Sequence, residues 1–320
     1  MATFTPLYKY RVLTFDDVMQ ELKLTHSATA GALARWQAQG LITMVRKNMY
    51  VIIDPTTGAP IADKYELSCK VSATSYIGWH TALEFHGVAH QPFYNAYVGS
   101  QSRFKEFSFK GIDFKYCSTP FEPSETNGVI HPIGNPYVRV TDLERTVIDC
   151  CNRIERAGGV EELLHCLESV SLLNESKLKK YLCLYNKAIL YQKVGFILER
   201  SQKFHHVSSK FIDMCKEKGA LHTKYLTTTG DSDTYIQQWK LYVPKDSITE
   251  NNIELFLWND ISFINVMPIW ILISALPLND MIRGCTFSKK GVASAVYGED
   301  SGLGLANHHF FNGFALAANV

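Results

Sequence analysis

Five polar side chains near the start of the sequence are of the types that contact nucleic acid. They are Ser27 and Arg35 in a predicted helix, and Arg46, Lys47 and Asn48 at a predicted turn. Guanidinium and ammonium groups neutralise backbone phosphates, whereas hydroxyl and amide groups can hydrogen-bond to base edges. The pattern therefore predicts DNA binding through these five residues.

Three histidines, His80, His86 and His90, raise the question of a metal site. Gly87 interrupts the pair His86/His90, and no carboxylate follows at ligand spacing. The cysteines form no CxxC pair, so a structural zinc site has no support either. We therefore expect no bound metal or other cofactor, and histidines that are hydrogen-bonded or face solvent.

Asp113 and Lys115 resemble the carboxylate and lysine of some metal-dependent nucleases. They lie in a predicted hairpin, and the choice of a second acid (Glu84 or Glu106) is arbitrary. A nuclease that uses these residues remains an alternative function. The sequence contains neither a glycine-rich phosphate loop nor a GxSxG elbow, and we expect no catalytic residues.

The run VTDLERTVID at residues 140–149 has charged side chains among apolar ones. Thr141 with Glu144 three residues later predicts a capping box, and Arg145 with Asp149 has the spacing of an ion pair within one helix. We interpret Thr141, Glu144, Arg145 and Asp149 as residues that fix a junction between a strand and a helix.

The first fifty residues predict two helices and a hairpin, which hold these side chains. Thr14 and Asp17 predict a cap for a helix at 15–22, and Thr25 or Ser27 caps a second helix that ends near Ala38. Its core stripe is Thr29, Leu33 and Trp36, and its outward face is predicted to carry His26, Ala28, Gly31, Ala32 and Arg35. Because these residues are mostly small, we expect modest sequence specificity.

Two apolar strands at 41–46 and 49–53 follow, with Lys47 and Asn48 in a tight turn between them. Helix, helix and basic-tipped hairpin is the order of a winged helix-turn-helix, which places its second helix in the major groove and its wing on the backbone. A winged helix used only for protein contacts remains an alternative.

The rest of the chain predicts a mixed α/β arrangement. Strands are predicted at 96–99, 107–110, 112–116, 138–140 and 237–244, and helices at 61–70, 75–87, 160–167, 177–185, 194–200 and 207–218. The fold class is thus α+β, with a winged helix at 1–55 and a mixed α/β domain at 61–250 whose carboxy-terminal half is helical. Residues 251–320 form a low-charge tail, which we expect to be accessory or poorly ordered.

Charge is distributed unevenly along a chain whose net charge is only +1, from 32 Lys+Arg and 31 Asp+Glu in 320 residues. A histone-like polycation is excluded, but a local basic surface is not. Residues 151–224 hold 13 Lys/Arg and 8 Asp/Glu, which suits either a solvated face or an acidic partner. The uncharged run 261–278 contains Pro268 and Pro277, which argue against a membrane-spanning helix. The first ten residues lack a secretory pattern, so we expect a cytoplasmic protein.

Several runs together resemble the AbiEi family, the antitoxins of abortive-infection (type IV) toxin–antitoxin pairs. They are MYVI after the basic turn, WHTALEFHG, VTDLERTVID, GGVEELL and KVGFILE. VTDLERTVID is the most specific, because it is similar to the family pattern V-[ST]-x-x-E-R-T-x-x-D. The resemblance covers about residues 11–245.

The resemblance implies a bacterial autoregulator that binds inverted repeats of double-stranded DNA in its own promoter. Its carboxy-terminal domain would neutralise a cognate nucleotidyltransferase-like toxin. By position, Ser27 and Arg35 would lie on the recognition helix and Arg46, Lys47 and Asn48 on the wing. Two departures are the short segment before Thr14 and the Ala/Gly-rich face of the second helix.

Overall fold

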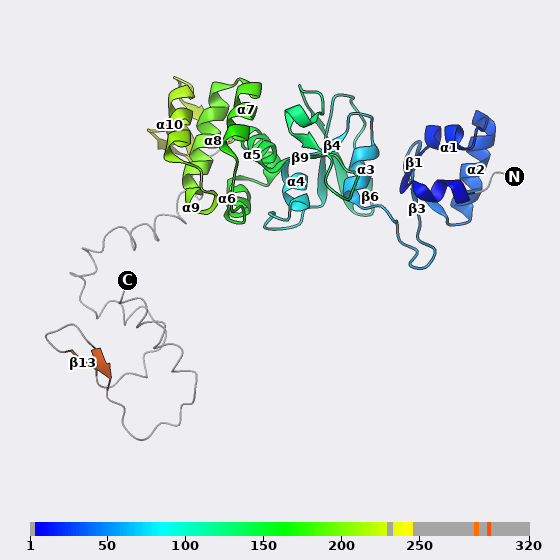
Figure 1. Ribbon diagram of the computed structural model, residues 1–320, viewed down its shortest axis with the longest axis horizontal. Coiled ribbons are helices and arrows are strands. Elements are labelled where there is room, and N and C mark those ends of the chain that lie inside the picture. The colour runs from blue at the N-terminus through cyan, green and yellow to red at the C-terminus, as the bar shows by residue number, and fades with distance from the viewer. Residues whose placement is uncertain (1–3, 229–232, 246–284, 288–292, 296–320) are drawn as a thin grey trace. The chain divides into compact units, whose positions relative to one another are not determined.

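The computed structural model describes residues 4–228, 233–245, 285–287 and 293–295 (Figure 1). Residues 1–254 form one compact unit and residues 255–320 another. In the second unit, two short strands, β13 (Cys285–Phe287) and β14 (Ala293–Ala295), pair antiparallel. The predicted tail, including its uncharged run 261–278, otherwise lies outside the described residues. No helix among those described is long and apolar enough to cross a membrane.

The amino-terminal residues form two helices and a small antiparallel sheet of order β1-β3-β2 (blue in Figure 1). A short 3-10 helix, η1, precedes them. The elements are η1 (Thr5–Lys9), β1 (Val12–Thr14), α1 (Phe15–Glu21), α2 (His26–Ala38), β2 (Ile42–Arg46) and β3 (Met49–Ile52). The predicted helices and hairpin are present in the predicted order. Strand β1 was not predicted; it pairs with β3, with Val12 opposite Val51.

Both helix starts follow from local capping chemistry. At α1 the Asp17 backbone N–H donates to Thr14 Oγ1 at 3.1 Å, and the Thr14 N–H donates to Asp17 Oδ2 at 2.7 Å. This is the predicted capping box, which satisfies two N–H groups that the first turn leaves free. At α2 the cap is Thr25, whose hydroxyl accepts from the Ala28 N–H at 3.3 Å, and Ser27 lies inside the helix.

The buried stripe of α2 contains Thr29, Ala32, Leu33 and Trp36. The prediction that Ala32 faces outward is wrong: it is 0% exposed. At 100° per residue, position 32 lies about 60° from position 29 and about 40° from position 36 around the helix axis, so it shares their buried side. The small Ala32 side chain lets α2 pack closely against the hydrophobic cluster of the amino-terminal residues.

The six-stranded sheet of the middle region has the order β6-β7-β5-β4-β9-β8. Its strands are β4 (Tyr76–Ile77), β5 (Asn95–Ser100), β6 (Phe107–Phe109), β7 (Ile112–Ser118), β8 (Val129–Ile130) and β9 (Val140–Thr141). The hairpin predicted around Gly111 is confirmed, with Phe109 opposite Ile112. Two short helices belong to this region, α3 (Lys64–Lys70) and α4 (Trp79–Phe85).

A single helix at 75–87 was predicted, and this is wrong at its start. Tyr76 and Ile77 form β4, which pairs with β5 on one side and β9 on the other. Helix α4 begins only at Trp79, after an extended Gly78. Pairing with strands distant in sequence overrides the local helical pattern here.

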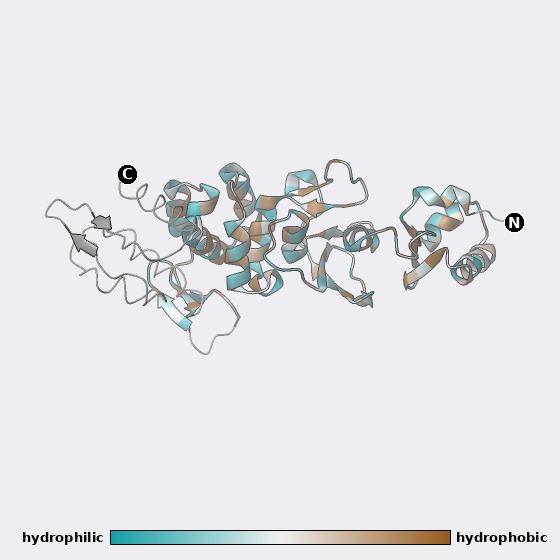
Figure 2. Ribbon diagram, turned by 90° about the horizontal axis from the view of Figure 1, so that it is seen from below, coloured by the Kyte–Doolittle hydropathy of each residue, from teal (hydrophilic) through white to brown (hydrophobic). Residues whose placement is uncertain are grey.

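The helical half packs around one large hydrophobic core. Its elements are α5 (Leu143–Asn152), the 3-10 helix η3 (Ile154–Ala157), α6 (Val160–Glu168), α7 (Glu175–Tyr185), α8 (Ala188–Arg200), α9 (Gln202–His205) and α10 (Ser209–Lys218). Asn174 caps α7 as predicted, and α8 begins six residues before the predicted start at 194. Figure 2 shows hydrophobic and hydrophilic residues on different sides of these helices, as amphipathic packing requires.

A second small sheet follows, of order β10-β12-β11. Its strands are β10 (Lys224–Tyr225), β11 (Asp233–Ile236) and β12 (Leu241–Pro244). The predicted strand 237–244 is therefore correct only in its second half, because residues 237–240 form a turn. The Trp239 indole from this turn lies against Gly195 in α8, where a side chain would collide with it.

The amino-terminal module packs directly on the middle sheet. Arg11 pairs with the buried Glu66 at 2.7 Å, and Lys70 pairs with Asp17 at 2.9 Å. One hydrophobic cluster contains residues from both regions, among them Val12, Val45 and Val51 on one side and Leu67, Val98 and Phe114 on the other. The turn-rich segment 54–60 thus connects regions that share a core.

Candidate nucleic-acid interface

The outward face of α2 is the first part of the candidate interface. Apart from the four buried positions, every residue of this helix is exposed, including the predicted contacts Ser27 and Arg35. A Cβ added at Gly31 would meet no atom within 4 Å. Ala34 is not among the predicted contacts, although the helical period that places Leu33 inside places Ala34 outside. The structure therefore leaves Ser27, Gly31, Ala34 and Arg35 accessible together on one helix.

The hairpin turn is the second part. Lys47 and Asn48 are both exposed, and Asn48 has a φ of +63°, a left-handed conformation that asparagine tolerates better than most residues. The Asn48 carbonyl accepts a hydrogen bond from the Phe15 N–H at 3.1 Å. The turn is therefore held against the start of α1, with the Lys47 side chain exposed.

Arg46 lies apart from Lys47 and Asn48, where the amino-terminal module contacts the middle region. Its guanidinium group lies 5.8 Å from the Phe104 ring and 5.3 Å from the Phe107 ring. One of its terminal nitrogens, Nη1, is buried without a hydrogen-bond partner in the described chain. The structure thus places four of the five predicted contacts on exposed positions and packs the fifth on aromatic rings.

The run at 140–149 forms the predicted junction between a strand and a helix, but with a different cap. The prediction that Thr141 caps the helix is wrong: Thr141 is the last residue of β9, and Asp142 is the N-cap, accepting from the Arg145 N–H at 2.8 Å. Glu144 does not complete a capping box. It accepts instead from the Asn174 N–H at 2.9 Å and so joins α5 to α7. The strand pairing of Thr141 moved the helix start by one residue.

Arg145 is the centre of a buried network, and its predicted pairing with Asp149 is confirmed. The Nε–Oδ1 distance is 2.8 Å, with side-chain exposures of 1% and 0%. Arg145 also donates to the Asn127 carbonyl at 2.6 Å and to the Tyr185 hydroxyl at 3.2 Å. Burial lowers the pKa of Arg145, but the Asp149 carboxylate together with Tyr185 and Tyr76 outweighs this effect, so the pKa of Arg145 is raised.

Two tyrosines of α7 close this network. The Tyr181 hydroxyl donates to Asp142 at 2.6 Å, and the Tyr185 hydroxyl donates to Asp149. Burial, together with these carboxylates, raises the pKa of both tyrosines. Both hydroxyls therefore stay protonated, and the network ties α5 to α7.

The three histidines considered as metal ligands are not gathered. The His86 Nε2 bonds to the Thr141 carbonyl at 2.7 Å, and His90 stacks on His165 with centroids 4.8 Å apart. His80 lies instead with Glu162 and Cys166, with possible ligand atoms within 4.8 Å of one another.

The geometry around Glu162 is that of a satisfied buried carboxylate. Its oxygens accept from His80 at 3.1 Å, from the His90 and Gln91 N–H groups at 3.2 and 3.3 Å, and from the Gln91 side chain at 3.1 Å. Burial raises the pKa of Cys166 to about 12, which disfavours the thiolate that a metal requires. These contacts hold α4 and the following loop against α6.

Asp113 and Lys115 lie on strand β7, and their side chains are partly exposed. Lys115 is 3.6 Å from Asp113 and 3.5 Å from Glu106, and the three side chains are 38–49% exposed. A hydrogen bond from Ser108, outweighing a small effect of burial, lowers the pKa of Asp113. The arrangement is a solvated ion pair across a hairpin rather than a pocket that would position a metal and a scissile phosphate.

No protein-family model matches the chain, and no curated protein sequence matches it. Among solved structures, the fold is similar to that of the RV2827C protein from Mycobacterium tuberculosis, with a TM-score of 0.55. The two sequences are 14% identical, and the match covers 74% of this chain and 88% of that protein. At this identity the likeness concerns the fold alone.

Proposed function

We propose that residues 4–53 form a winged helix that binds double-stranded DNA, with α2 as the recognition helix and β2–β3 as the wing. The observation that carries the proposal is the exposed face of α2, where Ser27, Gly31, Ala34 and Arg35 lie on an uncovered surface. A helix that enters the major groove needs such a face, with small residues where it approaches the bases and polar residues at its edges.

The distribution of charge supports the same orientation. Arg35 near the end of α2 and Lys47 at the hairpin turn are exposed cations on the two elements that would meet DNA. Lys47 would contact a phosphate, and Asn48 beside it supplies an amide for the backbone or the minor groove. Arg46 has a different role in this proposal: it secures the wing to the middle sheet.

We further propose that the chain is the antitoxin of a type IV pair, which represses its own operon and neutralises a nucleotidyltransferase-like toxin without enzymatic activity of its own. The support is the run at 140–149, whose Arg145 and Asp149 form the centre of the helical half. In this proposal the network maintains the fold of the domain that would neutralise the toxin.

The DNA-binding part is tested by fluorescence-anisotropy titration of the full chain with its own promoter fragment. Ala34→Glu places a carboxylate on the exposed face of α2 and should weaken binding by at least ~10-fold through repulsion from phosphates. Ser176→Glu, on an exposed position of α7, makes the same change in charge and should leave binding unaltered. Equal effects of the two variants would contradict the assignment of α2.

The antitoxin part is tested by co-expression with a nucleotidyltransferase-like gene from the same operon. We expect growth to be rescued by the wild type and by Ala34→Glu, because neutralisation is assigned to the other domain. Failure of the wild type to rescue growth would refute the antitoxin role and leave DNA binding standing. Magnesium-dependent DNA cleavage that is lost in Asp113→Ala would favour the nuclease alternative instead.

A further inference from the structure

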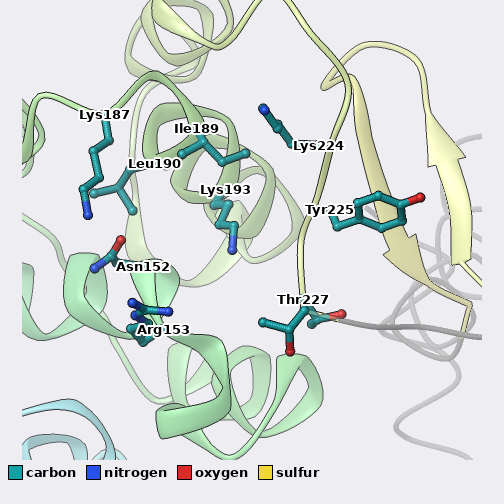
Figure 3. Close-up of a pocket in the computed structure, with 10 residues that line it drawn as sticks. Asn152, Arg153, Lys187, Ile189, Leu190, Lys193, Lys224, Tyr225 and Thr227 are labelled. Atoms are coloured by element: carbon teal, nitrogen blue, oxygen red, sulfur yellow. The ribbon is translucent and has the colours of Figure 1, made fainter. Parts of the chain in front are cut away.

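Two adjoining cavities in the helical half lie away from the proposed DNA-binding face. The first, of about 330 Å³, lies between the end of α5, the start of α8 and β10 (Figure 3). The second, of about 260 Å³, lies between the end of α5, α4 and the loop after β7. Asn152, Arg153 and Lys187 line both cavities, so the two adjoin at these side chains.

The walls of the two cavities are strongly basic. Lys193 and Lys224 line the first, Arg156 lines the second, and Arg153 and Lys187 are shared. Among the described residues, no Asp or Glu lines either cavity. Arg153 pairs with Glu155 at 3.9 Å, whereas the other four cations form no ion pair with a carboxylate of the described residues. Such an excess of cations around a concave surface concentrates positive potential and favours a multiply charged anion.

Lys193 is the least expected of these cations. Figure 3 shows its side chain directed into the space between Arg153 and Thr227. Burial lowers the pKa of Lys193, and no hydrogen bond or ion pair joins its ammonium group to any residue of 4–228 or 233–245. A half-buried ammonium without a counter-ion is costly for the fold, and a bound anion would remove that cost.

Two further donors in these walls have no partner. The Thr227 hydroxyl oxygen in the first cavity and the Trp79 indole nitrogen in the second are buried and make no hydrogen bond within the described chain. Trp79 is also held at a φ of +52°, a strained backbone conformation for a large aromatic residue. Unsatisfied donors and strain together are typical of a ligand site.

The shared part of the walls lies at the end of α5. Asn152 is the last residue of α5, the helix that carries the buried Arg145–Asp149 pair, and Arg153 follows it directly. Tyr185, which donates to Asp149, also lines the second cavity. Arg156 lies over the Trp79 ring at 4.8 Å. The network at residues 142–149 therefore positions the basic walls.

We infer that these two cavities bind a small ligand with at least two linked phosphate groups, such as a nucleoside diphosphate or inorganic pyrophosphate. Two guanidinium forks and three ammonium groups match the charge and the oxygen geometry of a diphosphate better than those of a single carboxylate. The cavity volumes suit a small molecule rather than an extended polymer.

The test is isothermal titration calorimetry of the full chain with inorganic pyrophosphate, ADP and adenosine at low ionic strength. Pyrophosphate and ADP should both bind, whereas adenosine should give no heat. Lys193→Gln should weaken the binding of both by at least ~10-fold. It should not lower the melting temperature, because it removes a desolvated charge that has no partner in the fold.

Lys210→Gln provides the matched control, because Lys210 is an exposed lysine of α10 and the change in charge is the same. Its affinity for pyrophosphate should stay within ~2-fold of the wild type. Absence of pyrophosphate binding, or an equal loss in both variants, would overturn the inference. Binding of a single-stranded oligonucleotide that depends on Lys193, without binding of pyrophosphate, would assign the cavities to nucleic acid and also contradict it.

Discussion

At the scale of single residues, the structure separates charges that hold the fold from charges that face solvent. Arg145 is 1% exposed and is satisfied by a carboxylate, a backbone carbonyl and a hydroxyl. Lys177 bridges Asp142 and Glu144 from the surface, at 3.1 and 3.3 Å, and its side chain is 45% exposed. The two cations should therefore differ greatly in their effect on stability.

Replacing Arg145 with methionine should lower the free energy of unfolding by about 3–5 kcal/mol, because Asp149 would remain buried without a counter-charge. Lys177→Met should cost less than about 1 kcal/mol, since its pairs are screened by water. Urea denaturation of both variants measures the difference. Equal losses would show that burial does not determine how much these ion pairs contribute to the free energy of unfolding.

His205 predicts a dependence of stability on pH. It is buried, its Nδ1 accepts from the Val207 N–H at 3.4 Å, and burial lowers its pKa to about 4. Because the unfolded histidine titrates near 6.5, its contribution to stability is complete above that pH and is lost as the pH falls toward 4. Between pH 7.5 and pH 5, His205 should account for a loss of about 2 kcal/mol.

The measurement is urea denaturation at both pH values for the wild type and for His205→Gln. Glutamine does not titrate, so the variant should lose less stability between pH 7.5 and pH 5 than the wild type does. Identical losses in the two proteins would show that His205 is protonated equally in the folded and unfolded states.

At the scale of elements, locally encoded features were predictable and pairings across the chain were not. Residues that are close in sequence determine the cap of α1, formed by Thr14 and Asp17, and the turn at Lys47. Strands β1 and β4 have two or three residues each, and they exist because of partners elsewhere in the sequence. The same cause moved the cap of α5 from Thr141 to Asp142.

The candidate sites divide in the same way. Ser27, Arg35 and Lys47 could be placed from helical period and turn chemistry. The packing of Arg46 on Phe104 and Phe107, and the meeting of Arg153, Lys193 and Lys224 around one cavity, depend on tertiary contacts. The only advance signal for the cavities was the excess of lysine and arginine at 151–224.

Replacing two helical glycines with alanine should change the free energy of unfolding in opposite directions. Gly31→Ala in α2 meets open space and should raise the free energy of unfolding by about 0.5–1 kcal/mol, because alanine favours the helix. Gly195→Ala in α8 would collide with Trp239 and lie 2.8 Å from the Cβ of Cys215. It should lower that free energy by about 1–3 kcal/mol. Thermal denaturation of both variants checks the signs, and stabilisation by Gly195→Ala would contradict the packing of α8.

At the scale of the whole molecule, the amino-terminal module and the middle sheet share a hydrophobic core. Arg46 of the module packs beside this core on the rings of Phe104 and Phe107, whereas its neighbour Lys47 is exposed. Arg46→Ala should therefore lower the free energy of unfolding by about 1–2 kcal/mol, and Lys47→Ala should leave it within about 0.5 kcal/mol. Denaturation curves for the two single variants decide this. Equal stabilities would place the Arg46 side chain in solvent.

The salt dependence of DNA binding tests the central claim most directly. Affinity of the full chain for its promoter fragment is measured from low to moderate salt, for the wild type and for Arg35→Gln with Lys47→Gln. If α2 and the wing contact phosphates, the double variant should bind more weakly, and its log–log salt slope should be smaller in magnitude by about 2. An unchanged slope and affinity would contradict the claim that these two elements bind DNA.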